Sequence, residues 1–86
     1  MFDLGMLIAT KAVVSEVGEK EIGKALFKHL NGDYGVVSDD DKQANVDALK
    51  NGDRLLSAYI SGKGVKFWII TEGDRSRTTV LLPSEY

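Results

Sequence analysis

The densest group of polar side chains lies in residues 71–79, which hold two carboxylates, two guanidinium groups and four hydroxyls. In a catalytic interpretation, Glu72 is a general base, a guanidinium group binds a phosphate through two parallel hydrogen bonds, and a hydroxyl orients it. In the alternative interpretation, the segment is a polar hairpin turn whose side chains bond the local backbone. The candidate side chains are Glu72, Asp74, Arg75, Ser76, Arg77 and Thr78.

Two aromatic residues, Tyr59 and Trp68, fall on neighbouring predicted strands. If the register places both on the solvated side of the sheet, they form an aromatic platform flanked by Lys66 or Arg77. Such a platform can anchor a protein partner or stack nucleic-acid bases. In the alternative interpretation, one of the two rings fills the core under the helices.

His29 is the only histidine of the chain. An unperturbed imidazole titrates near neutral pH, so His29 is the natural acid or base of a hydrolytic site. Its position beside Leu26 and Leu30 on a predicted helix favours a structural role at the border of the core, bonded to backbone or to Asn45.

Cofactor and metal sites have little support in the sequence. The three acidic residues 39–41 are consecutive, so on a helix they point in different directions, and they suit a helix start better than a cation site. The chain contains no cysteine and a single histidine, which excludes a thiolate or zinc cluster. It also lacks a phosphate-binding glycine motif and a nucleophile elbow, so we expect no cofactor.

These candidates must be positioned by a sheet in the C-terminal half. The hydrophobic period changes there from about four residues to two, and β-branched and aromatic residues accumulate. Short polar turns separate the apolar runs, which requires neighbouring strands to be antiparallel. The sequence predicts a three-stranded antiparallel meander with strands at residues 54–60, 65–72 and 77–82.

The N-terminal half predicts one strand and two to three short helices. An apolar run at residues 4–9 forms the strand, which we expect to pair with the strand at 77–82. Thr10 caps a helix at 11–17, Gly18 ends it, and a second helix covers 19–31. Ser38 caps a third helix at 39–50. This helix has a thin apolar face, which suits close packing or the covering of an edge; its members are Ala44, Ala48 and Leu49, with Asn45 on the same side.

Composition places the chain among ordinary globular proteins. It has 86 residues, of which 43% are hydrophobic and 28% charged, so we expect one α+β domain over residues 1–86 with the helices packed on one face of the sheet. A net charge of −2 gives no general attraction to nucleic acid. The apolar N-terminal run is too short to span a bilayer, and the absence of cysteine suits a reducing compartment. The expected location is the cytoplasm, with no membrane association.

Nearly the whole chain carries a family resemblance. It rests on residues 2–5 (FDLG), 9–10 (AT), 32–35 (GDYG), 53–59 (DRLLSAY), 68–72 (WIITE), 74–76 (DRS), 78–83 (TTVLLP) and 85–86 (EY). With these segments, the chain resembles small bacterial proteins described as plasmid-related, some of which carry the name type I restriction subunit M. Residues 11–28 diverge, with Lys11 at a position where the family suggests a proline. The resemblance implies a mobile-element setting; a methyltransferase needs a larger fold and a glycine-rich loop.

Two functional hypotheses follow. The favoured one is a non-enzymatic accessory or inhibitor module that presents the outer sheet face and the 72–77 turn to another protein. The alternative is a small ribonuclease, because helices followed by an antiparallel meander resemble barnase-like and RelE-like toxins. Its candidate acid, base and phosphate ligands are His29, Glu72, Arg75 and Ser76.

Overall fold

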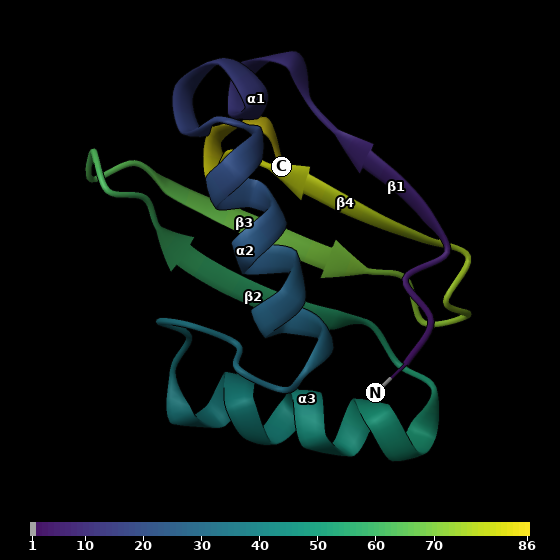
Figure 1. The fold of residues 1–86 in the computed structure, drawn as a ribbon. Coiled ribbons are helices and arrows are strands. Elements are labelled where there is room, and N and C mark those ends of the chain that lie inside the picture. The colour runs from purple at the N-terminus through teal and green to yellow at the C-terminus, as the bar shows by residue number, and fades with distance from the viewer. Residues whose placement is uncertain (1) are drawn as a thin grey trace.

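The computed structural model describes residues 2–86 and has the predicted α+β class (Figure 1). Every predicted element is present, with ends that differ by at most two residues. In chain order these are β1 (Met6–Ala9), α1 (Lys11–Val17), α2 (Glu19–Leu30), α3 (Asp39–Asn51), β2 (Leu55–Ile60), β3 (Lys66–Thr71), β4 (Arg77–Leu81) and the short 3-10 helix η1 (Pro83–Glu85).

The four strands form one mixed sheet in the order β1-β4-β3-β2. Strands β2, β3 and β4 make the predicted antiparallel meander. The predicted pairing of the N-terminal strand with β4 is confirmed, and it is parallel, with Met6 opposite Arg77 and Ala9 opposite Val80. Because parallel neighbours need a crossover, all three helices and two strands lie between β1 and β4 in the chain.

Capping residues set the helix ends as the sequence predicts. The Thr10 hydroxyl accepts a hydrogen bond from the Val13 N–H at 3.1 Å, and the Ser38 hydroxyl accepts one from the Asp41 N–H at 3.1 Å. Gly18 adopts a φ of 93°, which side-chain-bearing residues rarely reach, so the chain turns there and α1 and α2 are two separate helices.

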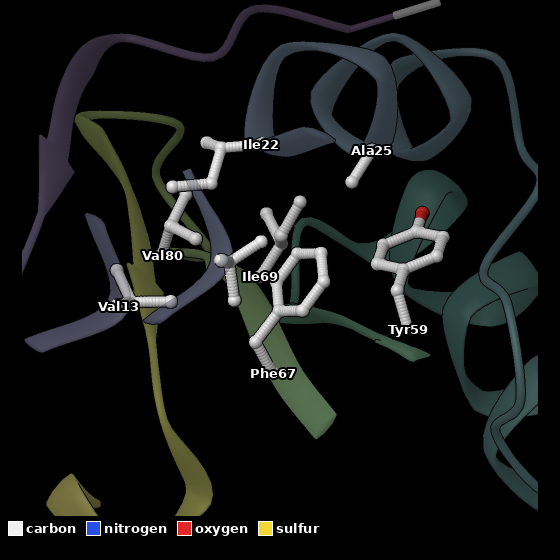
Figure 2. Packing of buried hydrophobic residues seen from close by; sticks show 8 residues of the cluster. Val13, Ile22, Ala25, Tyr59, Phe67, Ile69 and Val80 are labelled. Atoms are coloured by element: carbon white, nitrogen blue, oxygen red, sulfur yellow. The ribbon is translucent and has the colours of Figure 1, made fainter. Parts of the chain in front are cut away.

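The hydrophobic core lies between the sheet and the pair α1 and α2. Figure 2 shows side chains from the two helices meeting side chains from β2, β3 and β4. The buried members are Val13, Val17, Ile22, Ala25, Tyr59, Phe67, Ile69 and Val80. Both helices therefore cover the same face of the sheet, as expected. No helix within residues 2–86 is long and apolar enough to cross a bilayer.

Helix α3 lies along the β2 edge of the sheet (Figure 1). Asn45 is buried there, and its side-chain amide donates to the Leu56 carbonyl at 2.7 Å and accepts from the Leu56 N–H at 3.0 Å. The amide therefore bonds β2 as a further strand would. The predicted apolar face of α3 was only partly right: Ala48 is buried, but Ala44 and Leu49 are exposed because the helix covers an edge and not a face.

Candidate functional site

The histidine lies inside the molecule at the start of a chain of polar side chains. His29 is 0% exposed, with Nδ1 2.5 Å from the Ser57 hydroxyl and Nε2 2.9 Å from the Thr71 hydroxyl. The Thr71 hydroxyl lies 2.8 Å from the Thr78 hydroxyl. The Thr78 hydroxyl donates to the Leu4 carbonyl at 2.7 Å. The structural role is as expected, but the expected partners, backbone or Asn45, are wrong: the ring bonds the side chains of Ser57 and Thr71, and the Asn45 amide bonds the edge of β2.

The proton positions in this chain follow from counting donors. The carbonyl of Leu4 can only accept, so the single hydroxyl proton of Thr78 goes to it. Thr71 must then donate to Thr78, which leaves the His29 Nε2–H to donate to Thr71. With a neutral ring, Nδ1 accepts from the Ser57 hydroxyl. We therefore assign the Nε2–H tautomer to His29.

His29 stays neutral at physiological pH. Burial, followed by the nearby positive charge of Arg75, lowers the pKa of His29 from 6.5 to about 4. A serine hydroxyl donating to an imidazole is the arrangement of an activated nucleophile. Here, however, Ser57 and His29 are both 0% exposed, so no substrate carbonyl or phosphate reaches them. The network holds α2 on β2 and β3.

Arg75 acts as a clamp between three segments of backbone. One terminal nitrogen, Nη1, donates to the carbonyls of Asp53, Glu72 and Gly73 at 2.7 to 3.1 Å. The other, Nη2, donates to the Ala48 carbonyl at 3.1 Å. The guanidinium group therefore ties the end of α3 to the β3–β4 turn, and its terminal nitrogens are directed at backbone carbonyls and not at a ligand.

The other polar residues of the turn occupy different environments. Asp74 accepts from the Ser76 N–H at 2.9 Å, and hydrogen bonds from the side chain and backbone of Ser76 lower the Asp74 pKa. These local bonds match the polar-turn interpretation. Thr78 is buried in the histidine network and cannot orient a phosphate, whereas Arg77 is exposed and Glu72 half-buried.

Tyr59 and Trp68 lie on opposite faces of the sheet. The register pairs Tyr59 with Phe67 and Ala58 with Trp68, so the two aromatic rings point in opposite directions. Tyr59 is buried under α2, where its hydroxyl donates to the Asp33 carbonyl at 2.6 Å and burial raises its pKa to about 12. The expected two-ring platform therefore does not form.

Trp68 has a different aromatic neighbour. The chain turns at η1 and brings Tyr86 to Trp68, with ring centroids 5.6 Å apart in an edge-to-face arrangement. The Arg54 guanidinium lies 5.5 Å from the centre of the Tyr86 ring and donates to its hydroxyl. This pair lies on the sheet face away from α1 and α2, which we call the open face.

The open face is apolar with a basic margin. Strand alternation assigns it Met6, Ile8, Leu56, Ala58, Ile60, Lys66, Trp68, Ile70, Arg77, Thr79 and Leu81, to which the C-terminus adds Tyr86. Met6 and Tyr86 are each 67% exposed and Ile60 is 57% exposed. Three cations border these side chains: Lys66 and Arg77 are exposed at strand ends, and Arg54 covers Tyr86. Such a face can bind an apolar surface that has carboxylates at its edge.

A pocket of about 280 Å³ lies on the helix side of the sheet, between α2 and the end of β2. The buried rings of Tyr59 and Phe67 line it, and Lys24 and Lys28 are exposed at its rim. Glu21 also borders it and accepts from the Gly62 N–H at 2.8 Å. None of the four residues expected of a nuclease lines this pocket.

Sequence reasoning missed several members of these sites. Ser57 lies on the same side of β2 as Tyr59, and that alternation was the available signal for its place beneath α2. Nothing in the sequence indicated that Met6, Ile8 and Ile60 are exposed, because an apolar residue in a predicted strand is expected to be covered. The role of Tyr86 depends on the turn at η1, which brings the end of the chain back over β3.

Metal binding finds no support among the residues that the structure describes: no cluster of three or more His, Asp or Glu side chains is placed to hold an ion. The acidic run at 39–41 forms the first turn of α3, as the capping interpretation predicts. The resemblance to plasmid-related proteins stays a prediction. Comparison of the chain with protein-family models, with curated proteins and with solved structures gave no match.

Proposed function

We propose that this chain is a non-enzymatic protein-interaction module, an accessory or inhibitor protein of a mobile element, that binds its partner through the open face. The observation that carries the proposal is the exposure of Ile60 and Tyr86 beside Trp68, on the sheet face that α1 and α2 do not cover. Contiguous exposed apolar surface on a small protein marks an interaction site. The partner is a protein with an apolar patch bordered by carboxylates, complementary to Arg54, Lys66 and Arg77.

Two observations favour a protein over single-stranded nucleic acid as the partner. Base stacking needs free aromatic faces, but Trp68 is in contact with Tyr86, and Arg54 lies over the Tyr86 ring. The net charge of −2 also gives no overall attraction to a polyanion. The ribonuclease alternative has weaker support, because His29 has no exposed surface and Arg75 bonds backbone carbonyls.

The test compares the binding of two variants in which lysine replaces an exposed β-branched residue, Ile60 in one and Val46 in the other. Ile60→Lys places a charge on the open face, and Val46→Lys places the same charge on the exposed surface of α3, which lies along the β2 edge. Tagged wild type and both variants are used to capture proteins from the native host, and a captured protein is then purified and titrated against all three. We expect Ile60→Lys to weaken binding at least ~10-fold and Val46→Lys to bind as wild type does.

The charge of the partner is tested with the same purified pair. Binding should weaken as salt rises, and Arg77→Glu should reduce both the affinity and its salt dependence. Equal binding by Ile60→Lys and Val46→Lys would overturn the assignment of the open face. Cleavage of RNA by the wild-type protein, lost in Glu72→Gln, would overturn the non-enzymatic proposal.

A further inference from the structure

The pocket between α2 and the end of β2 belongs to neither the histidine network nor the open face. Its lining comes from α2, from residues 35 and 36, from the end of β2 and from β3. Its volume of about 280 Å³ lies just below the range of roughly 300–1,000 Å³ that is typical of small-molecule sites. An occupant of this pocket is therefore a small molecule.

The inner wall of the pocket is aromatic. Tyr59 and Phe67 are 7% and 2% exposed, and their ring centroids lie 5.8 Å apart. Figure 2 shows both rings beneath α2, whose Ala25 also lines the pocket. The Tyr59 hydroxyl already donates to the Asp33 carbonyl, so the wall offers mainly ring carbon to a ligand. Such a wall suits the apolar part of a ligand.

The end of β2 adds a backbone donor to the pocket. Ala58 directs both of its backbone groups to residues 34–36, whereas the Ser61 N–H bonds Val65 on the β3 side. Because backbone groups alternate along a strand, Ile60 points its N–H outward as Ala58 does. The bridge that residues 34–36 make is isolated and does not continue to Ile60, so no backbone carbonyl within residues 2–86 accepts from this N–H. Ile60 lines the pocket, and its N–H is available to a ligand.

The rim of the pocket is positively charged. Lys24 and Lys28 are one helical turn apart on α2, and both are exposed. Glu21 is the only acidic residue of the lining, and its carboxylate accepts from the Gly62 N–H at 2.8 Å. The two lysines outweigh the glutamate by a single positive charge. This balance suits a carboxylate better than a phosphate ester, which carries a charge of about −1.5 to −2.

We propose that this pocket binds a small apolar carboxylate. The apolar group of the ligand lies against the rings of Tyr59 and Phe67. Its carboxylate accepts hydrogen bonds from Lys24, Lys28 and the Ile60 N–H. An apolar wall with a few polar groups that fix orientation is the usual composition of a small-ligand site.

This inference does not rest on the proposed function, because the pocket lies on the helix side of the sheet and the protein partner is assigned to the open face. The two are also measured separately. A chain that binds a carboxylate and captures no partner, or one that captures a partner and binds no carboxylate, would tell them apart.

The first experiment titrates three probes into isotope-labelled protein and follows the backbone amide signals by NMR. Naphthylacetate has both parts of the proposed ligand, naphthylethanol lacks the charge, and acetate lacks the ring. We expect naphthylacetate to shift the amide signals of Gly35, Ile60 and Ser61 with a dissociation constant of roughly 0.1–1 mM. The other two probes should bind at least ~10-fold more weakly.

Three results of this titration would overturn the proposal. The first is the absence of a saturable shift with naphthylacetate up to about 10 mM, well above the expected dissociation constant. The second is equal binding of naphthylethanol, which would remove the role of the carboxylate. The third is a set of shifts confined to Trp68 and Tyr86, which would place the probe on the open face.

The second experiment tests the rim lysines with two double variants of equal net charge. Lys24→Gln with Lys28→Gln removes the charges at the pocket. The control, Lys11→Gln with Lys20→Gln, removes two exposed lysines that do not line it. We expect the first variant to bind naphthylacetate ~10-fold more weakly and the control to stay within ~2-fold of wild type. NMR spectra confirm that both fold, and equal losses in the two would overturn the site.

The third experiment tests the charge and the class of the ligand. Glu21→Gln keeps an acceptor for the Gly62 N–H and removes the opposing charge, so naphthylacetate should bind ~2-fold more tightly. Tighter binding of naphthyl phosphate than of naphthylacetate to the wild-type protein would overturn the singly charged ligand. Tighter binding of an amidated dipeptide of glutamate and phenylalanine would replace the small molecule by a protein segment.

Discussion

At the scale of single residues, the two side chains with the richest chemistry stabilise the fold. His29 donates and accepts within a buried network, and Arg75 bonds backbone carbonyls at the end of α3 and in the β3–β4 turn. A single histidine and an arginine in a polar turn resemble catalytic groups in sequence. The burial of His29 and the backbone partners of Arg75 set them apart from catalytic groups, and this distinction is a tertiary one.

The depressed pKa of His29 makes stability depend on pH. The unfolded chain binds a proton near pH 6.5, whereas the folded chain resists protonation down to about pH 4. Stability is therefore complete above pH 6.5 and falls as pH decreases towards 4, by up to roughly 3 kcal/mol. Urea unfolding, followed by the fluorescence of the single tryptophan, measures this at pH 7, 6 and 5. The same slope in His29→Gln would contradict the assignment.

Arg75 combines a clamp with an unusual backbone conformation, since it is a non-glycine residue with a φ of 61°. Arg75→Ala removes the bonds to four carbonyls and keeps the conformational cost, so we expect a loss of ~2–3 kcal/mol in unfolding free energy. Arg75→Gly removes the same bonds but relieves the left-handed backbone, and should be more stable than Arg75→Ala by ~1 kcal/mol. Thermal unfolding of the two variants measures the difference; equal stability would argue against backbone strain.

At the scale of elements, the sheet is asymmetric. Its helix side is closed by α1 and α2, and its β2 edge by α3 and residues 34–36 (Figure 1). Its β1 edge and the margins of the open face stay accessible, whereas Ala58, Ile70 and Leu81 on that face are buried. The proposed function concerns the accessible part of the open face. At the β2 edge, the Asn45 side chain and residues 34–36 are enough to bond the backbone groups of Leu56 and Ala58.

The segment at the β2 edge depends on a glycine. A Cβ on Gly35 would collide with the Ala58 carbonyl oxygen, and its φ of 75° already disfavours other residues. Gly32 has a similar φ of 86° but open space around it. Gly32→Ala should cost ~1 kcal/mol, the backbone term alone, and Gly35→Ala at least ~2 kcal/mol more. Chemical denaturation compares the two, and similar losses would mean that residues 34–36 do not pack against β2.

At the scale of the whole molecule, the C-terminal residues contact both the start of α1 and strand β3. The Glu85 carboxylate accepts from the Leu82 N–H at 2.9 Å and from the Thr10 hydroxyl at 2.7 Å, which joins the start of α1 to the end of the chain. The same turn places Tyr86 against Trp68 on β3. The last residues therefore connect the helical layer with the open face.

Removal of the terminal ring should expose Trp68. In Tyr86→Ala, we expect Trp68 emission to shift to longer wavelength and the unfolding free energy to fall by ~1 kcal/mol, since the aromatic contact is lost. Tyr86→Phe keeps the ring and removes only the hydroxyl that accepts from Arg54, so its emission should match that of wild type. Fluorescence spectra of the folded proteins make the comparison. An unshifted spectrum in Tyr86→Ala would contradict the packing of Tyr86 on Trp68.

The sequence by itself determined the fold class, the elements and most of their ends. Hydrophobic period separates helices from strands, and local capping groups such as Thr10, Ser38 and Gly18 act within a few residues of the ends they set. The pairing of β1 with β4 matched our expectation, but the sequence did not determine where β1 lies or that the pair is parallel; only the tertiary structure placed it. The fold class, the elements and their ends depend on neighbours along the chain and on the apolar pattern of each segment, and both are visible in the order of the residues.

Only the tertiary structure decided which of these residues face solvent. One residue of register separates Tyr59 in the core from Trp68 on the open face, because side chains alternate along a strand. The contacts of His29 with Ser57 and Thr71, and those of Arg75 with the Ala48 and Asp53 carbonyls, depend on segments 22 to 42 residues apart coming together. Such contacts arise from packing, and composition and spacing do not specify them.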